Sequence, residues 1–452
     1  MRSEKKELPY IGLGIFKLRF PVIHYKLEKV ELIQGLILGA TAMSAIPYMT
    51  DYLGLPYELA WSCIILETFL YFLHASLGDP VIPGWITATL PLTLAYLTTY
   101  EIGQERIQAM IALQIMVGLT FVFMGVTRLA DRFIKAIPPS IKGGILLATP
   151  ITVMQSQLSD SGQLRMYPIA VGVGALFLAI ISFSKKYEEA RKKYKVLDII
   201  GRYGNLFPYL VAMVIGIIVG ELVFPSVEIG TFIKIPQFKE MIDTVSIFGV
   251  GIPKMKMFLN AIPLALICYI IAFGDFVTSE SLIKEAKEVR DDEIIDFNSS
   301  RSNIISGIRN IVLAIFAPFP PLAGPLWVGM TVSVSLRYRE GKEAMKSLLG
   351  GMASFRLGTL VSVICIPLIT FLKPVFPIGA GITLIFQAFV CARIGMEYCE
   401  SDLDKSIAAI MAVVLAMEGS IWALIVGFGL NIVLSNWEIK GLGKKQTNNN
   451  TN

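Results

Sequence analysis

The chain of 452 residues is too apolar to fold as a soluble protein, since 54% of its residues are hydrophobic and 17% are charged, with a mean hydropathy of +0.64. The net charge of +5 needs no nucleic-acid partner, because the lysines and arginines collect in the connections between apolar runs. These values exclude a soluble enzyme and predict an all-α polytopic membrane protein.

Fourteen apolar segments follow one another along the chain when each proline-broken stretch is counted as one crossing. The apolar runs are long enough to cross a hydrocarbon core about 30 Å thick, at roughly 20 residues per helix, and the shortest ones are the proline-broken or paired spans. The predicted spans lie near residues 30–49, 56–74, 84–99, 106–127, 138–156, 166–184, 206–224, 257–277, 302–317, 324–337, 346–372, 375–394, 404–418 and 419–435. A charged N-terminal segment, 1–29, precedes them, and a polar tail, 436–452, follows.

Basic residues mark one side of this arrangement. Short cytoplasmic loops carry an excess of Lys and Arg, whereas external loops do not. The basic connections are 1–29, 128–135, 185–195, 337–346 and the tail, and the connections without Lys or Arg are 50–55, 100–105 and 157–164. Segment 225–256, predicted to be external, holds four lysines and departs from the pattern. We expect both termini to be cytoplasmic and the protein to lie in the plasma (inner) membrane.

Two segments in corresponding halves share the pattern Pro-x-Trp-(Ile or Val)-x-x-Thr, at residues 83–89 and 325–331. Each follows a proline-broken run and then becomes apolar for several helical turns. Unwound backbone at membrane depth persists only where protein or a water-filled cavity satisfies it, and half-helix N-termini there attract substrate. We therefore predict that the two segments face each other across one substrate site. Its predicted wall residues are Trp85, Ile86, Thr87, Gly324, Pro325, Leu326 and Trp327.

The spacing of these landmarks indicates an internal duplication. The two tryptophans are 242 positions apart, and Pro138 and Pro377, which open two similar Pro/Gly-containing spans, are 239 apart. The predicted repeats are 30–225, with spans 1–7, and 226–435, with spans 8–14.

From about residue 27 to 436 the chain resembles the xanthine/uracil permease (nucleobase-ascorbate transporter) family. The resemblance rests on Gln34 thirteen residues before Pro47, on the two Pro-x-Trp segments, on the Ile-Pro and Gly-Gly-Ile pattern of span 5, and on Phe273-Gly274-Asp275 in span 8. It implies two inverted repeats, with short strands before the broken spans 3 and 10. It also implies a core domain from spans 1–4 and 8–11, a gate domain from spans 5–7 and 12–14, an elevator-type mechanism, and substrate contact by Gln34.

The chain departs from that family where acidic residues usually hold the base. Ile271 and the stretch 325–327 occupy those positions, and Gly35 replaces the usual His. Asp275 with Thr278 and Ser279 instead resembles sulfate permease-like anion transporters, which share the fold and some of which bind sodium on this helix. Carboxylate and hydroxyl oxygens suit a hard cation. We predict that these three residues couple an ion and that Asp275 also contacts substrate; the alternative places Asp275 in water or beside a lysine.

Further ionisable residues lie at or near membrane depth, where burial is costly enough to make each a functional candidate. They are Glu67, Lys142, Arg309, Arg356 and Glu418. Arg356 is expected to pair with a carboxylate such as Glu67, to attract an anionic substrate, or to reach the cytoplasmic surface. The tryptophans stack on a flat substrate or plug the space between half-helices.

The function predicted from the sequence is a secondary active transporter, a symporter of a small polar or anionic solute such as a nucleobase-like compound, coupled to Na⁺ or H⁺. The alternatives are a sulfate permease-like anion transporter and a channel-like protein of the same fold. The sequence holds no nucleotide loop or nucleophile motif, and its two histidines and scattered cysteines suggest no metal site, so we expect neither an enzyme nor a cofactor beyond a bound Na⁺. The expected partners are the solute and the lipid bilayer, and a homodimer is one option for the assembly.

Overall fold

The computed structural model describes residues 6–129, 132, 137–160, 162–203, 206–418 and 420–435. Within these residues, five helices are long and apolar enough to cross a membrane, or up to seven if each of two bent helix pairs is one span. The five are Lys29–Leu53, Tyr57–Ser76, Gln104–Val126, Met255–Val289 and Ile366–Tyr398. They confirm a polytopic α-helical membrane protein, whereas the count of fourteen stays a prediction. The predicted tail, 436–452, lies outside the described residues.

The first half of the chain contains proline-broken helices joined by short turns. Pro47 lies in the first turn of α2, where its missing N–H is no loss, and Gly54 ends that helix with φ of 72°. The elements are β1 (Ile11–Leu13), β2 (Phe16–Leu18), α1 (Lys29–Leu38), η1 (Gly39–Ala45), α2 (Ile46–Leu53), α3 (Tyr57–Leu70), α4 (Phe72–Ser76), β3 (Gly84–Trp85), η2 (Thr87–Thr89), α5 (Leu90–Leu97), α6 (Gln104–Val126), α8 (Pro139–Leu158), α9 (Gln163–Met166), α10 (Pro168–Phe183), α11 (Lys185–Arg191), α12 (Lys195–Arg202) and α13 (Leu206–Ile218).

The second half contains the longest helix and several capped ones. Asn298 and Ser347 accept hydrogen bonds from the backbone N–H of Arg301 and Gly350, which caps α17 and α19. The elements are α14 (Phe238–Val245), α15 (Ile247–Val250), α16 (Met255–Val289), α17 (Ser299–Phe316), β4 (Ala323–Gly324), α18 (Val328–Arg339), α19 (Leu348–Ile364), α20 (Ile366–Leu372), η3 (Lys373–Val375), α21 (Phe376–Tyr398), α22 (Asp402–Glu418) and α23 (Ser420–Ser435).

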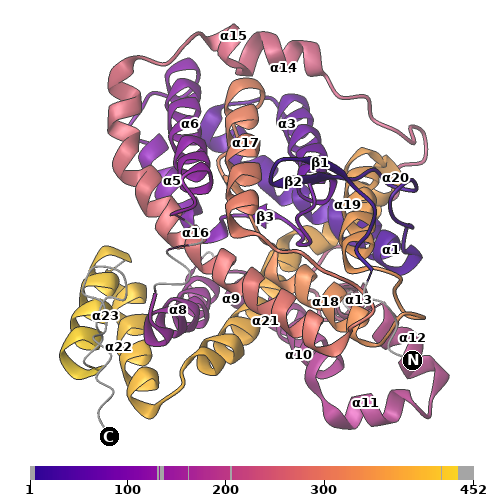
Figure 1. Cartoon of the computed structure of the whole chain (residues 1–452). Helices are drawn as coiled ribbons and strands as arrows, with labels where there is room; N and C mark the ends of the chain where they lie inside the picture. Colours follow the sequence, from indigo (N-terminus) through magenta and orange to yellow (C-terminus); the bar gives the residue numbers. More distant parts are fainter. Residues whose placement is uncertain are drawn as a thin grey trace, which may run out of the picture.

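The helices form two groups in space (Figure 1). Helices α3, α6 and α17 run roughly parallel in the upper part of the view, and α8, α21, α22 and α23 lie together below them. Helix α1 packs on α19, α6 packs on both α16 and α17, and α8 packs on α21 and α22. The long helix α16 extends from the upper group down toward the lower one.

Helices α1 and α19 approach each other at glycines. A Cβ on Gly35 would lie 1.9 Å from the carbonyl oxygen of Phe355, and one on Gly358 would lie 2.2 Å from that of Leu32. Small residues permit such backbone contact in membrane proteins, where close packing substitutes for the hydrophobic driving force. This crossing fixes α19 against the first span.

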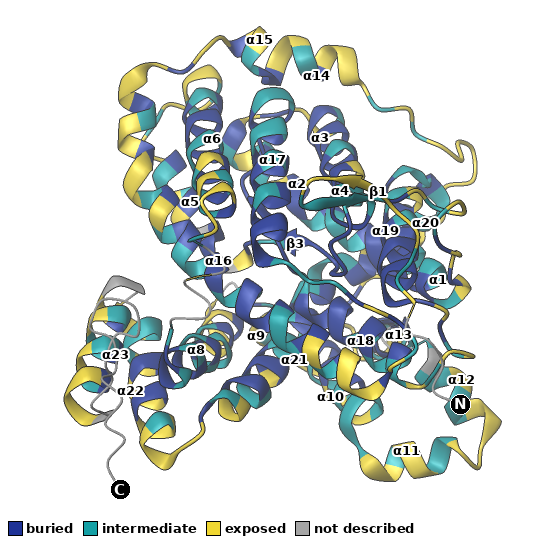
Figure 2. Cartoon of the chain, in the orientation of Figure 1, coloured by how far each residue is buried: buried dark blue, intermediate teal, exposed yellow. Residues whose placement is uncertain are grey.

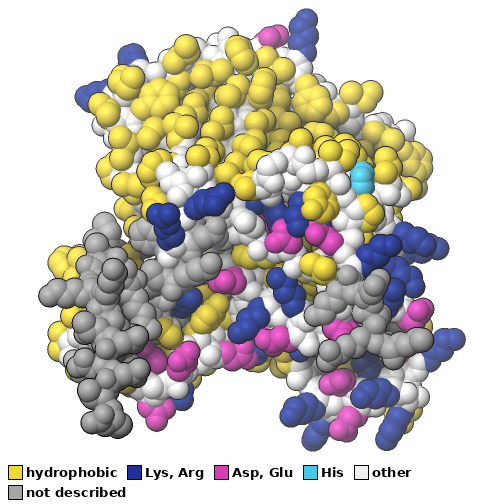
Figure 3. Space-filling view, viewed as in Figure 1, with side chains coloured by type: hydrophobic (Ala, Val, Ile, Leu, Met, Phe, Trp, Pro, Cys, Tyr) yellow, Lys and Arg dark blue, Asp and Glu magenta, His cyan; other side chains and the backbone are white. Residues whose placement is uncertain are grey.

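Burial and surface chemistry agree with a membrane environment. Figure 2 shows buried residues along the facing sides of α3, α17 and α19, while much of α11 and α14 is exposed. In Figure 3, apolar side chains cover the upper part of this face almost continuously, and charged side chains gather below them. An apolar surface of this extent is typical of contact with lipid.

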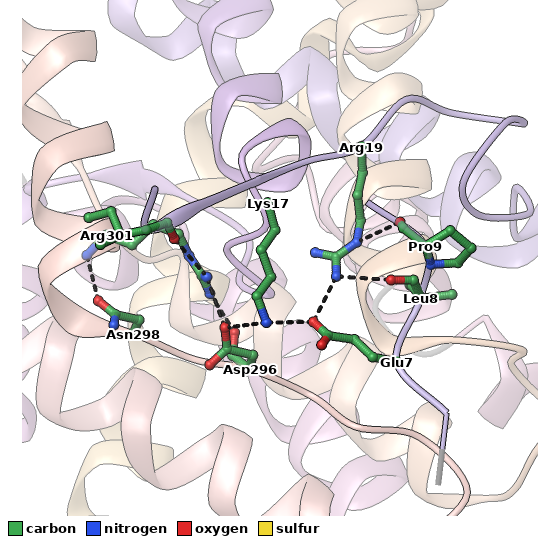
Figure 4. A network of polar contacts seen from close by, with 9 residues as sticks. Glu7, Leu8, Pro9, Lys17, Arg19, Asp296, Asn298 and Arg301 are labelled. Carbon is green, nitrogen blue, oxygen red and sulfur yellow. Dashed lines mark hydrogen bonds and ion pairs between the residues drawn. The ribbon is translucent and has the colours of Figure 1, made fainter. Parts of the chain in front are cut away.

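The N-terminal segment folds back onto the connection before α17. Strands β1 and β2 form an antiparallel hairpin, and Lys17 at the second strand bonds both Glu7 at 2.6 Å and Asp296 at 2.9 Å. Arg301 also bonds Asp296, at 3.0 Å, and Arg19 bonds Glu7 at 3.0 Å (Figure 4). These contacts tie residues 7–19 to the start of α17.

Candidate functional site

Strands β3 and β4 pair antiparallel and bring the two Pro-x-Trp segments together, as predicted. Gly84 lies opposite Gly324, and Trp85 lies opposite Ala323. Two more bonds lengthen the ribbon: the N–H of Ile86 donates to Leu322 at 3.1 Å, and the N–H of Trp327 donates to Ile82 at 2.6 Å. Segments far apart in the sequence therefore meet directly before α5 and α18 begin.

The two paired glycines are required by the closeness of these strands. A Cβ on Gly84 would lie 2.9 Å from the carbonyl oxygen of Leu326, and one on Gly324 would lie 2.8 Å from the carbonyl carbon of Trp85. Any larger residue would push the strands apart. The predicted wall residue Gly324 thus has a structural role in the pairing.

The helix starts beyond the strands carry no side-chain caps. Ile86 and Trp327 are the N-cap residues of η2 and α18, and neither side chain accepts a bond from the first turn. Helix N-termini present N–H groups and a partial positive charge. Thr87, in the first turn of η2, is exposed. These positions favour an acceptor or an anion between the two half-helices.

The remaining predicted wall residues divide by burial. Ile86 is 2% exposed and Leu326 is 3% exposed, and Pro325 is also buried, so the structure places these three in packed positions. Trp85 and Trp327 are half-buried.

The two tryptophans have different surroundings. Trp85 packs edge-on against Phe319 with ring centroids 5.5 Å apart, and its Nε1–H is buried without a hydrogen-bond partner in the described part of the chain. Trp327 packs edge-on against Phe355 at 5.8 Å and lies 5.2 Å from the guanidinium carbon of Arg356. The rings are therefore not a matched pair of stacking surfaces.

Asp275 lies in the middle of α16, which packs against both η2 and α18. Its carboxylate is half-buried and makes no hydrogen bond or ion pair with any described residue that would support the lysine alternative. The Thr278 hydroxyl donates to the carbonyl of Gly274 at 2.9 Å, and the Ser279 hydroxyl donates to the carbonyl of Asp275 at 2.8 Å. The hydroxyl hydrogens are thus engaged by the helix, and both residues are buried.

Gln34, the other predicted substrate contact, is 2% exposed in α1. This helix packs chiefly on α19. Lys142 is half-buried with its ammonium 5.4 Å from the ring of Tyr398, and Glu418 is exposed.

A buried polar cluster lies directly behind the strands. Arg309 of α17 donates to Glu67 at 2.8 Å and to the carbonyls of Gly324 at 2.8 Å and Gly84 at 3.4 Å. Both charged side chains are at most 1% exposed. One guanidinium therefore joins an ion pair to both strands. Arg356 was the partner predicted for Glu67 from the sequence. In the structure, Glu67 hydrogen-bonds Arg309 instead.

Other members of this cluster were not identified from the sequence. His74 lies 3.3 Å from Arg309 and bonds Asp79 at 2.8 Å. On the other side, Asn310 exchanges two bonds with the backbone of Ala323, at 2.8 and 3.0 Å. The adjacent Arg309 and Asn310 inside the predicted span 302–317 were the available signal, because buried polar side chains need partners.

Comparisons with known proteins support the fold. No protein-family model matches the chain, and no curated protein matches it. The murine Solute Carrier 26 family member A9 anion transporter, in its inward-facing state, matches with TM-score 0.52 and 13% identity over 92% of this chain and 70% of that chain. The transmembrane domain of the cyanobacterium bicarbonate transporter BicA (TM-score 0.47, 13% identity, 90% and 99% covered) and SLC26A9 (0.49, 14%, 90% and 65%) also match.

These likenesses are to the sulfate permease-like side of the resemblance, and the xanthine/uracil permease assignment is not confirmed. At 13% identity the likeness to the murine structure concerns fold alone. The chain therefore has the multi-span helical membrane fold found in that transporter.

Proposed function

We propose that the protein is a secondary transporter that carries a small anionic solute through a site between the starts of η2–α5 and α18. The observation that supports this most directly is the β3–β4 pairing, which opposes two uncapped half-helix N-termini at one place. Fixed N–H groups and positive dipole ends at such a place bind an anion without further charged residues.

The chemistry of the site favours an anion over a nucleobase-like compound. The walls present donors, among them the indole N–H of Trp85, which has no partner among the described residues. The stretch 325–327 supplies no carboxylate to accept the N–H groups of a base. A flat solute remains the second candidate because both tryptophan rings are half-buried and offer apolar surface.

We further propose that Asp275, with the oxygens of Thr278 and Ser279, binds the coupling Na⁺ or H⁺. A carboxylate without an ion-pair partner among the described residues is available for a cation, and α16 packs against both half-helices. Movement of a core of spans 1–4 and 8–11 against a gate of spans 5–7 and 12–14 would alternate access to the site.

Counterflow in proteoliposomes tests the proposal. Purified protein is reconstituted, loaded with unlabelled solute, and given the same labelled solute outside, with chloride, bicarbonate, formate, sulfate, uracil and xanthine as separate arms. We expect exchange acceleration for one or more anions. Acceleration for uracil or xanthine alone would favour the second candidate, and saturable uptake without exchange acceleration for any solute would indicate a channel-like protein.

A further inference from the structure

Arg356 of α19 is a buried cation with an unusual environment. Its side chain is 1% exposed, and its guanidinium carbon lies 3.7 Å from the ring centroid of Tyr71 and 5.2 Å from that of Trp327. The aromatic faces hold the guanidinium by cation–π attraction. Such contacts leave the N–H groups in the guanidinium plane free to bond something else.

Nothing in the described part of the chain accepts those N–H groups. Nε and Nη2 are both buried without a hydrogen-bond partner, and Arg356 forms no ion pair there. The neighbouring carboxylates each bond another group through one oxygen, Glu67 to Arg309 and Asp79 to His74, and neither hydrogen-bonds Arg356 in the described part of the chain. A buried donor left unpaired costs roughly 1–3 kcal/mol, and more when it is charged. For Arg356 two such donors lie on one guanidinium, beside Trp327.

The free edge has a defined chemical preference. Nε–H and Nη2–H point the same way from one planar group, which matches two coplanar oxygens of a carboxylate or a bicarbonate. A halide has one centre and cannot use both donors with the same geometry. Trp327 is also the N-cap residue of α18, so an anion at this edge lies beside a helix N-terminus.

We propose that Arg356 is a specificity-determining residue of the transport site, which binds planar oxyanions of the carboxylate or bicarbonate type through its Nε/Nη2 edge. This rests on the proposed function and deepens it. Tyr71 is 5% exposed, whereas Trp327 is half-buried and is the ring that solvent reaches. The oxyanion therefore enters by displacing the Trp327 ring while Tyr71 keeps the guanidinium in place.

Thermal unfolding of the purified full chain separates ligand binding from structural support. Without added anion, Arg356→Gln should melt close to the parent, because the lost cation–π contacts are offset by the removal of a buried cation without a hydrogen-bond partner. The matched variant Arg309→Gln should melt well below it, because it breaks a buried ion pair. If Arg356→Gln melts as low as Arg309→Gln, Arg356 is a structural counter-charge to Glu67 and the proposal is wrong.

Anion titrations then test the ligand class, with formate, bicarbonate and chloride as separate arms at constant pH and ionic strength. Formate or bicarbonate should raise the melting temperature of the parent, with an apparent affinity about tenfold or more weaker in Arg356→Gln, the loss expected for a charged bidentate bond. Arg356→Lys keeps the positive charge and loses the two coplanar N–H donors. The rise in its melting temperature with the oxyanions should therefore be smaller than in the parent, while the rise with chloride is retained. The oxyanion that raises the melting temperature of the parent identifies the ligand. An equal rise in melting temperature for Arg356→Gln and the parent would overturn the proposal.

Counterflow keeps this inference distinct from the proposed function. If the parent exchanges anions and Arg356→Gln exchanges them with unchanged selectivity, the role of Arg356 is refuted and the transport proposal stands. If the parent exchanges no solute, transport is refuted, whereas an Arg356-dependent melting shift would still establish the oxyanion site.

Discussion

Glu67 and Arg309 form an ion pair in the centre of the structure, with Nη2 2.8 Å from Oε1 and both side chains at most 1% exposed. They are 242 positions apart, which is also the separation of Trp85 and Trp327. Corresponding positions of the two proposed repeats thus carry opposite charges that meet. This relationship supports the duplication, and it explains how two strands from distant parts of the chain are fastened at membrane depth.

Removing one member of this pair should destabilise the protein severely. Glu67→Gln or Arg309→Gln leaves a buried charge uncompensated, which costs about 3–5 kcal/mol. The double variant should lose less than the sum of the two, and thermal unfolding in detergent measures all three. Glu340→Gln, which breaks a partly exposed ion pair with Arg191, is the control and should change stability little. Additive losses in the double variant would show that the two charges do not interact.

The paired half-helices should contact the solute. Trp85→Ala or Trp327→Ala enlarges the site and should weaken binding by up to about tenfold, the scale of one aromatic contact. Bound solute should protect a cysteine at the exposed position Thr87 from chemical modification. Val214→Ala and Leu384→Ala, in α13 and α21, are controls that should bind as the parent does. Unchanged binding by both tryptophan variants, without protection at Thr87, would place the site elsewhere.

A cysteine at Gly329 reports on a different event. A Cβ there would lie 3.4 Å from Phe386 and 3.5 Å from Thr383, both on α21, so the position is closed by that helix. We expect slow labelling that speeds up only when α18 and α21 separate, and solute should change the labelling rate. A rate as fast as at Thr87, and independent of solute, would show that the two helices do not pack stably.

Asp275→Asn should abolish ion-driven accumulation while the protein remains folded. The carboxylate has no hydrogen bond or ion pair with a described residue, so its loss changes cation affinity more than packing. Uptake under sodium and proton gradients is the measurement, and Asp51→Asn, an exposed carboxylate near the end of α2, is the control. The same gradient dependence in Asp275→Asn and the parent would rule out this ion site.

The basic connections 185–195 and 337–346 should both face the cytoplasm. The structure places them on the same side of the molecule, since Arg191 and Glu340 bond at 2.6 Å. Cysteines at Lys193 and Lys342 should resist impermeant reagents in right-side-out vesicles, and one at Glu101 should react. Labelling of Lys193 or Lys342 from outside would contradict the predicted topology.

Asp296→Asn should loosen the N-terminal segment, because this carboxylate bonds both Lys17 and Arg301. Burial alone would raise the pKa of Asp296, but these hydrogen bonds outweigh it and hold the pKa below its ordinary value. The attachment is therefore complete above the unfolded pKa, near 4, and is lost as the pH falls through the lower folded value. Hydrogen exchange of residues 6–19 against pH measures this. Glu343→Gln, at an exposed carboxylate, is the control. Equal hydrogen exchange of residues 6–19 in Asp296→Asn and the parent would show that Asp296 does not hold the N-terminal segment in place.

The sequence by itself determined the membrane class and the broken segments, and the family resemblance added the short strands before them. Apolar length and proline breaks act locally, so they can be recognised without knowing the partners. Local patterns place helix ends less well: span 8 was expected to end at 277, where polar residues begin, yet α16 continues to Val289. Charged residues mark the membrane boundary and do not by themselves end a helix.

Only the tertiary structure decided which buried charges meet. Arg356 was the partner considered for Glu67 from the sequence, but the packing of α3, α17 and α19 brings Arg309 to Glu67 instead. Likewise, Asp79 and His74 join the buried polar cluster through Arg309, which hydrogen-bonds the backbone carbonyls of Gly84 and Gly324 in the two strands. Buried polar groups select partners by angstrom-scale geometry across hundreds of residues. That geometry leaves Nε and Nη2 of Arg356, behind Trp327, without a hydrogen-bond partner among the described residues.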